Sequence, residues 1–140
     1  MQWNKLVPEL IVTDLDKSYH FWVEILGFSV MYQRTEEKFI YVELDGVQFM
    51  LEQQQEGQWL TGVLAYPLGR GINFQFEVDQ LDSILNRLDV AQWPLFAALE
   101  ERWYRAETIE HGQKQFLVQD PDGYLLRIVE VIGERAITLD

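Results

Sequence analysis

Apolar and polar residues alternate along several short stretches of the chain, and this alternation predicts β-strands. In residues 71–78, one face would carry Ile72, Phe74, Phe76 and Val78, and the other Asn73, Gln75 and Glu77. The same pattern predicts strands over residues 6–13, 28–32, 38–44 and 47–53, and shorter ones over 95–99 and 104–109. Pro8 suggests that the first strand begins a ladder or lies at a sheet edge, because proline donates no ladder hydrogen bond.

Two other stretches repeat their apolar residues at helical spacing. One helix is predicted over residues 15–26, with Asp14 as its N-cap and Gly27 as the residue that ends it. A second helix is predicted from the spacing of Leu81, Ile84, Leu85 and Leu88. Asp79 or Asp82 could cap it.

Turn sequences join neighbouring strands into hairpins. Asp45-Gly46 connects the strands over 38–44 and 47–53. Within residues 113–130, the turn sequence Asp120-Pro121-Asp122-Gly123 joins two apolar runs, since proline pre-sets φ and glycine accepts a positive φ. A charged turn at Glu100-Glu101-Arg102 is predicted between the two short strands.

The order of the predicted elements repeats: strand, helix and three strands occur twice. The sequence therefore predicts an α+β fold in one domain over residues 1–140, with module 1 at about 1–53 and module 2 at about 71–132. The connector, residues 54–70, keeps apolar residues such as Trp59, Leu60 and Tyr66. A flexible linker would not keep them, so we expect a partly packed segment that acts as a lid or a subunit contact.

Composition narrows the function. The 140 residues include 23 acidic and 11 basic side chains, a formal charge of −12 that argues against nucleic-acid binding and is compatible with a cationic ligand. There is no cysteine, so disulfides and thiolate chemistry are excluded. No stretch resembles a membrane span or a signal peptide, and a cytoplasmic location is the expectation.

Several motifs together resemble the vicinal oxygen chelate superfamily, which includes glyoxalase I, extradiol dioxygenases and bleomycin-resistance proteins. They are Val12-Thr13-Asp14-Leu15, Ser18, Phe21-Trp22, Leu26-Gly27-Phe28 and Asp120 to Leu126. Val7-Pro8 with Leu10, and the Phe21-Trp22 pair, look most like the bleomycin-resistance branch. The resemblance implies two βαβββ modules whose curled, mixed sheets surround a cleft, with the helices packed outside. It also implies a homodimer with its ligand clefts at the subunit interface.

Metal-dependent members of this superfamily bind a divalent ion through His and Glu on four strands. In this chain the four corresponding positions hold Val7, Met50, Asn73 and Arg127. Valine, methionine and arginine do not ligate such a metal, so we expect no metal and no other cofactor. A register error of one residue would bring Glu9 or Glu52 into the cleft differently, but no histidine. His20 is expected on a helix surface and His111 in a loop.

Polar side chains dominate the sheet faces opposite the helices. The residues expected on these faces are Glu9, Tyr41, Glu43, Gln48, Met50, Glu52, Asn73, Gln75, Glu77 and Arg127. These residues either form an ordinary solvated sheet face or line a carboxylate-rich cleft. Trp59, Tyr66, Trp103 and Tyr104 would be its aromatic walls or part of the core. Arg127 would pair with Glu77 or Glu9, or present its guanidinium to an anionic group.

A cleft of this kind suits a cationic or aromatic organic compound. The leading hypothesis is a metal-independent, non-catalytic binding protein of the bleomycin-resistance type, which sequesters such a compound and forms a homodimer. One alternative is a metalloenzyme of the glyoxalase or dioxygenase kind with a non-standard ligand set. Another is an interaction module without a ligand.

Overall fold

The computed structural model describes residues 2–137. Module 1 contains β1 (Glu9–Val12), α1 (Leu15–Tyr19), the helical segment η1 (His20–Ile25), β2 (Ser29–Arg34), β3 (Phe39–Leu44) and β4 (Val47–Gln53), with a short 3₁₀ turn, η2 (Thr35–Glu37). The strands form one mixed sheet in the order β1-β4-β3-β2. Only β1 and β4 run parallel. The predicted first half is confirmed, including β1 at the sheet edge.

The first helix has the predicted start and end. The Asp14 side chain accepts hydrogen bonds from the backbone N–H groups of Asp16 and Lys17, as an N-cap should. From His20 to Ile25 the segment is a π-helix, and at its end the Leu26 N–H donates a hydrogen bond to the Phe21 carbonyl. Gly27 follows at φ +95°, a conformation that favours glycine, and the chain turns into β2.

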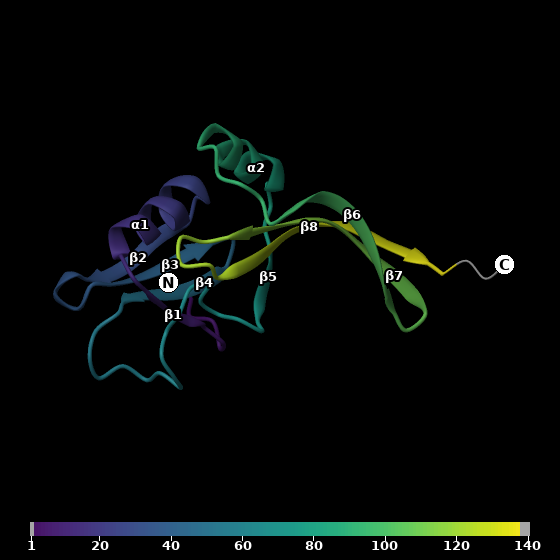
Figure 1. The fold of residues 1–140 in the computed structure, drawn as a ribbon. Helices are drawn as coiled ribbons and strands as arrows, with labels where there is room; N and C mark the ends of the chain where they lie inside the picture. Colours follow the sequence, from purple (N-terminus) through teal and green to yellow (C-terminus); the bar gives the residue numbers. More distant parts are fainter. Residues whose placement is uncertain (1, 138–140) are drawn as a thin grey trace.

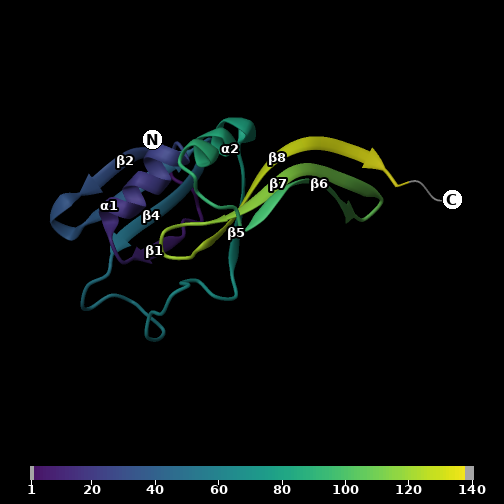
Figure 2. The same cartoon turned by 45° about the horizontal axis from the view of Figure 1, so that its top comes forward.

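Module 2 repeats the order with longer strands. It contains β5 (Asn73–Glu77), α2 (Leu81–Val90), β6 (Ala97–Ala106), β7 (Ile109–Gln119) and β8 (Leu125–Ala136). They form a second mixed sheet in the order β5-β8-β7-β6, in which β5 and β8 are parallel. The outer parts of its last three strands, residues 100–115 and 129–136, project from the body (Figures 1 and 2), and we call this extension the arm.

Two details of module 2 differ from the sequence prediction. The turn predicted at residues 100–102 is wrong, because β6 is continuous and the chain reverses at residues 107–108 instead. Charged residues can lie within this strand because it is an edge strand of the projecting arm, where solvent reaches them. The predicted cap of α2 is also wrong: Gln80 is at the N-cap without a side-chain bond, and the Asp79 N–H binds the Asp45 carboxylate.

One hydrophobic core joins the two modules. Both helices lie on the same side of the two sheets (Figure 1). Trp22 packs against Phe28 and Phe49, and Phe49 in turn contacts Phe74 and Phe76 of β5. The same buried cluster includes Leu81, Ile84 and Leu88 of α2 and Phe116, Val118, Leu126 and Ile128 of module 2. The opposite faces of both sheets point away from the two helices, and we call them the open faces.

Candidate functional site

Strand register determines which residues share the open face of module 1. Glu9 is paired with Met50, and Met50 with Tyr41, so these three form one row across β1, β4 and β3. Ile11, Glu52 and Phe39 form the next row. The predicted grouping of Glu9, Tyr41, Met50 and Glu52 on one face follows from this register.

A cavity of about 460 Å³ lies between this face and the connector. Glu9 and Ile11 of β1 line one side, and residues 59–65 and 67–70 of the connector line the other, together with Tyr124. The Tyr124 hydroxyl donates to the Ile11 carbonyl at 2.8 Å, which fixes this ring in the wall. Trp59 is 97% exposed, so its indole is available to whatever enters the cavity.

Glu9, which lines this cavity, interacts with a second carboxylate beside it, that of Glu52. Partial burial raises the pKa of Glu9, and hydrogen bonding and repulsion from Glu52 raise it further, while Arg34 opposes the rise. Glu52 also accepts a hydrogen bond from the Gln55 side chain at 2.8 Å. The arrangement disfavours two adjacent negative charges, so a ligand cation placed between them would be favourable.

Tyr41 and Glu43 do not line this cavity. Residues 2–4 lie over their part of the face, where Trp3 contacts the Tyr41 ring and Gln48 binds the backbone of Gln2 and Asn4. Gln48 also binds both predicted residues, through the Tyr41 hydroxyl at 2.5 Å and the Glu43 carboxylate at 2.9 Å. This part of the face is therefore covered by the chain itself.

A second hollow lies where the modules meet. Its volume is about 640 Å³, and it is lined by Asn4, Leu6, Pro8, Asp79 and residues 45–49 and 73–77. Three predicted residues, Asn73, Gln75 and Glu77, line it from the edge strand β5 and are exposed. Asp45, Glu77 and Asp79 make this inter-module groove acidic.

Arg127 lies beside Gln75 and Leu117 on the open face of module 2. No ion pair joins it to Glu77, Glu9 or any other acidic group of residues 2–137. Its buried Nε has no hydrogen-bond partner there. The predicted internal pairing of Arg127 is therefore absent, and a buried guanidinium N–H without a partner is costly.

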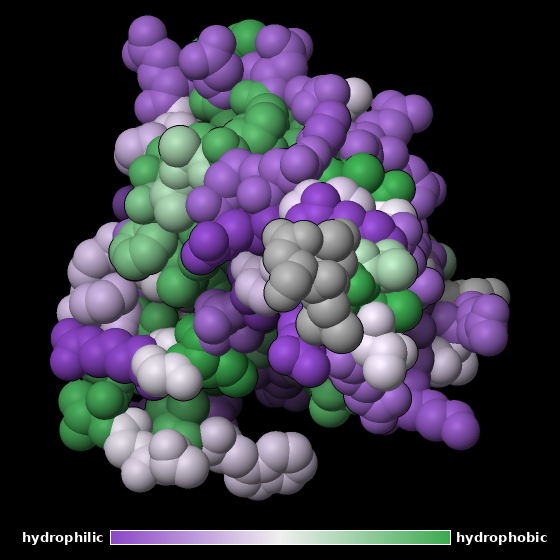
Figure 3. Space-filling model, turned by 90° about the vertical axis from the view of Figure 1, so that its right-hand side faces the viewer, coloured by the Kyte–Doolittle hydropathy of each residue, from purple (hydrophilic) through white to green (hydrophobic). Residues whose placement is uncertain are grey.

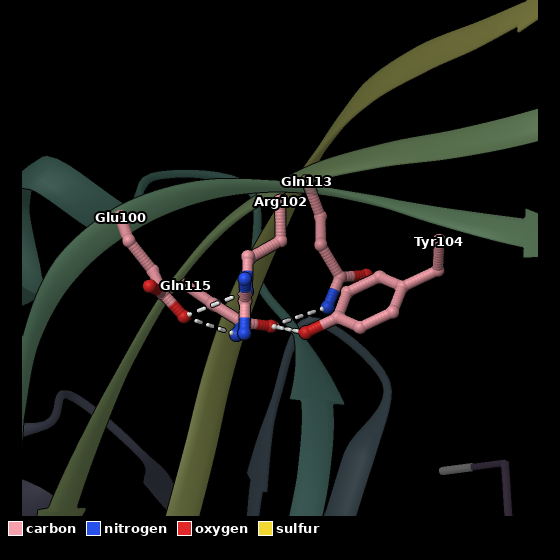
Figure 4. Close-up of polar contacts among 5 residues, drawn as sticks. All are labelled: Glu100, Arg102, Tyr104, Gln113 and Gln115. Carbon is pink, nitrogen blue, oxygen red and sulfur yellow. Dashed lines mark hydrogen bonds and ion pairs between the residues drawn. The ribbon is translucent and has the colours of Figure 1, made fainter.

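A polar cluster on the arm was not found from the sequence. Figure 4 shows Glu100, Arg102 and Tyr104 of β6 and Gln113 and Gln115 of β7 pointing to the same side. Gln115 Oε1 accepts from the Tyr104 hydroxyl at 3.0 Å and from Gln113 Nε2 at 2.9 Å, and Gln115 Nε2 donates to Glu100 at 2.9 Å. Arg102 lies 3.3 Å from the same carboxylate. The sequence did contain a signal for this cluster, because Glu100, Arg102 and Tyr104 occupy every second position, as on one face of a strand. The prediction of a turn at residues 100–102 obscured this pattern.

Trp103 lies on the opposite face of β6 from this cluster. Its indole covers Gly112 of β7, and the Arg135 guanidinium is 4.0 Å from its ring centroid. This cation–π contact braces the arm. The structure therefore separates Trp103 from Glu9, Glu52 and Trp59.

The four positions that correspond to metal ligands do not form a suitable donor set. Val7, Met50, Asn73 and Arg127 offer one amide between them and no carboxylate or imidazole. Within residues 2–137, no three His, Cys, Asp or Glu side chains are close enough together to hold a metal ion. His20 lies on the surface, 2.7 Å from Glu24. His111 lies in β7 rather than in a loop, opposite Tyr104.

These features define an α+β protein of two βαβββ modules, each with a four-stranded mixed sheet and one helix. The chain belongs to the Glyoxalase/Bleomycin resistance protein/Dioxygenase superfamily, whose sequence profile matches residues 5–128. None of the helices in residues 2–137 is both long and apolar enough to cross a bilayer. No curated protein sequence matches the chain.

The chain is also similar to several solved structures. A glyoxalase/bleomycin resistance protein/dioxygenase superfamily member from Vibrio splendidus 12B01 is 40% identical, over 87% of this chain and 94% of that one, with a TM-score of 0.40. A glyoxalase/bleomycin resistance protein/dioxygenase from Alicyclobacillus acidocaldarius is 20% identical, with 92% of each chain covered and a TM-score of 0.63. TioX from Micromonospora sp. ML1 is 18% identical, over 98% of this chain and all of that one, with a TM-score of 0.68.

Proposed function

We propose that the chain is a metal-independent binding protein of the bleomycin-resistance type, which sequesters a cationic or aromatic small molecule. The observation that carries this proposal is Glu9, which lines the cavity under the connector, together with the neighbouring carboxylate of Glu52. A ligand cation relieves the repulsion between the two carboxylates, and the wall formed by Trp59 and Tyr124 offers aromatic contact.

The charge of the whole chain supports the same ligand class. A formal charge of −12 attracts cations toward an acidic cleft and repels small anions. The inter-module groove adds further acidic groups. Arg127, whose buried Nε has no hydrogen-bond partner among residues 2–137, would bind an anionic group of a mixed-charge ligand.

A metalloenzyme of the glyoxalase kind fits less well. The donor set at Val7, Met50, Asn73 and Arg127 has no imidazole or carboxylate, and no step of metal chemistry can be assigned to it. Elemental analysis after native purification tests this point. One Zn, Ni, Fe or Mn per chain would contradict the proposal.

Calorimetric titration tests the ligand class. Bleomycin serves as the cationic aromatic probe and a small phosphonate as the anionic one. We expect wild type to prefer the cation, with an affinity that falls as salt is added, because salt screens the attraction. Tighter binding of the phosphonate would contradict the proposal.

Three glutamine substitutions locate the site. Glu9→Gln reports on the connector cavity and Glu77→Gln on the inter-module groove, while Glu36→Gln is a matched control on an exposed turn. We expect Glu9→Gln to weaken cation binding about tenfold, as loss of one charge-assisted contact would. If Glu9→Gln behaves like Glu36→Gln, the carboxylates merely face solvent.

A further inference from the structure

The open face of module 1 holds a built platform of two stacked tyrosines and a buried amide. The rings of Tyr32 and Tyr41 lie 5.1 Å apart with an interplanar angle of 19°. The side chain of Gln48 is only 2% exposed, and it receives the Tyr41 hydroxyl and donates to Glu43. These bonds fix the Tyr41 ring and the Gln48 amide on β3 and β4.

Residues 2–4 occupy this platform in the manner of a bound peptide. Gln48 Oε1 accepts from the Asn4 backbone N–H at 2.9 Å, and Gln48 Nε2 donates to the Gln2 carbonyl at 2.6 Å. The two backbone groups flank Trp3, so one side-chain amide holds the backbone on both sides of an aromatic residue. Proteins that bind extended peptides use the same interaction, hydrogen bonds to the N–H and C=O groups of the peptide backbone.

The indole of Trp3 rests on the tyrosines without being buried. It meets Tyr41 edge-to-face at 5.1 Å and 81°, and Tyr32 at 5.7 Å and 68°. Yet 58% of Trp3 remains exposed. Edge-to-face contacts of this kind are favourable but modest, so the ring can leave while the core stays intact.

We infer that Tyr32, Tyr41 and Gln48 form a binding site for short peptides or amides with an aromatic side chain, and that residues 2–4 are its displaceable occupant. The ligand's ring would replace Trp3 on the tyrosines. Its carbonyl and N–H would replace those of Gln2 and Asn4 on Gln48. The site shares no residue with the connector cavity, so the Trp3→Ala and Glu9→Gln variants test the two proposals separately.

The probe that tests this inference is N-acetyl-L-tryptophanamide, with N-acetyl-L-alaninamide as the control that lacks the ring. The proteins are wild type, Trp3→Ala, Trp3→Ala combined with Tyr32→Ala, and Tyr19→Ala as the control for an exposed aromatic residue outside the platform. Calorimetry should show at least tenfold tighter binding of the tryptophan probe to Trp3→Ala than to wild type. Adding Tyr32→Ala should remove that gain, and Tyr19→Ala should match wild type.

Hydrogen exchange in the wild-type protein supplies a second readout. The Asn4 N–H is protected by Gln48, and saturating probe should speed up its exchange while the core amides of β3 and β4 stay protected. Equal probe binding by Trp3→Ala and wild type would overturn the inference. So would unchanged Asn4 exchange at saturation, equal binding of the alanine control, or a Trp3→Ala variant that fails to fold.

Discussion

Thr13 and Asp122 join the two modules through two hydrogen bonds to one carboxylate. The Thr13 N–H donates to Asp122 Oδ2 at 3.1 Å, and its hydroxyl donates to Oδ1 at 2.5 Å. Asp122 is buried in the turn before β8, and Thr13 directly follows β1. The contact therefore fixes the end of one module's first strand to the last turn of the other.

Asp122→Asn should reduce the free energy of unfolding by about 1–3 kcal/mol, because an amide accepts through one oxygen and leaves the second donor unpaired. Urea denaturation measures the change. Asp89→Asn, at an exposed position near the end of α2, is the control and should stay within about 0.5 kcal/mol of wild type. Equal effects of the two variants would mean that the contact contributes nothing.

Asp120 should make stability depend on pH. Burial raises the pKa of its carboxyl to about 7. The carboxylate accepts hydrogen bonds from Tyr124 N–H, Trp22 Nε1–H and Asp122 N–H, and these bonds lower the pKa and so oppose part of the rise. The folded protein thus holds this proton more tightly than the unfolded chain. The resulting stability is fully present below pH about 4 and is lost as pH rises through about 7.

Each unit of pKa difference corresponds to about 1.4 kcal/mol, so the loss for Asp120 amounts to a few kcal/mol. Urea denaturation at pH 5, 6, 7 and 8 measures it. Asp120→Asn cannot titrate and should flatten the profile, while the remaining titratable groups contribute equally to both proteins. Parallel profiles for wild type and variant would show that burial does not raise this pKa.

Gly112 should tolerate no side chain. A Cβ there would come within 2.5 Å of the Trp103 ring, which Arg135 holds from the other side. Gly112→Ala should therefore reduce the free energy of unfolding by about 1–3 kcal/mol through overpacking. Gly62→Ala is the matched control, since nothing lies within 4 Å of its Cβ position. Similar denaturation midpoints for both variants would refute the close packing of the arm.

The protein should form a homodimer. Phe96, Leu99, Val131 and Ile132 are exposed near or on the arm, and Figure 3 shows hydrophobic patches interrupting the mostly hydrophilic face seen from that side. A second copy that covered them would gain apolar burial. Light scattering at micromolar concentration should give about twice the chain mass. Val131→Glu should shift the balance toward monomer, and a monomeric wild type would contradict the prediction.

Most of the fold could be predicted because its signals are local. Alternation located the strands, and Asp14, Gly27 and the two Asp-Gly turns marked where elements begin and end. The error at residues 100–102 has a physical cause. Consecutive charged residues are compatible with a turn and with a solvent-exposed edge strand, and the sequence does not show that the arm projects into solvent. Sequence periodicity reports burial, and an exposed strand gives a weak signal.

The site was harder to predict because it depends on contacts between distant segments. The strand register places Glu9 and Glu52 on the same face of neighbouring strands. The connector cavity could not be predicted without the position of residues 59–70. Nothing local in Tyr41 or Glu43 indicates that residues 2–4 cover them. Trp103 and Tyr104 are adjacent in sequence, yet they point to opposite faces of β6.

The position of β8 has a consequence for how the chain matures during synthesis. Among residues 2–137, β8 is the last strand to be synthesised, yet it lies inside its sheet, between β5 and β7. Until the ribosome releases it, β5 has no neighbour, and its unpaired backbone can accept a strand from another nascent chain. Module 1, whose strands are complete by Gln53, has no such delay. Translation speed between the codons of β5 and those of β8 should therefore influence how much of the protein exchanges strands between copies.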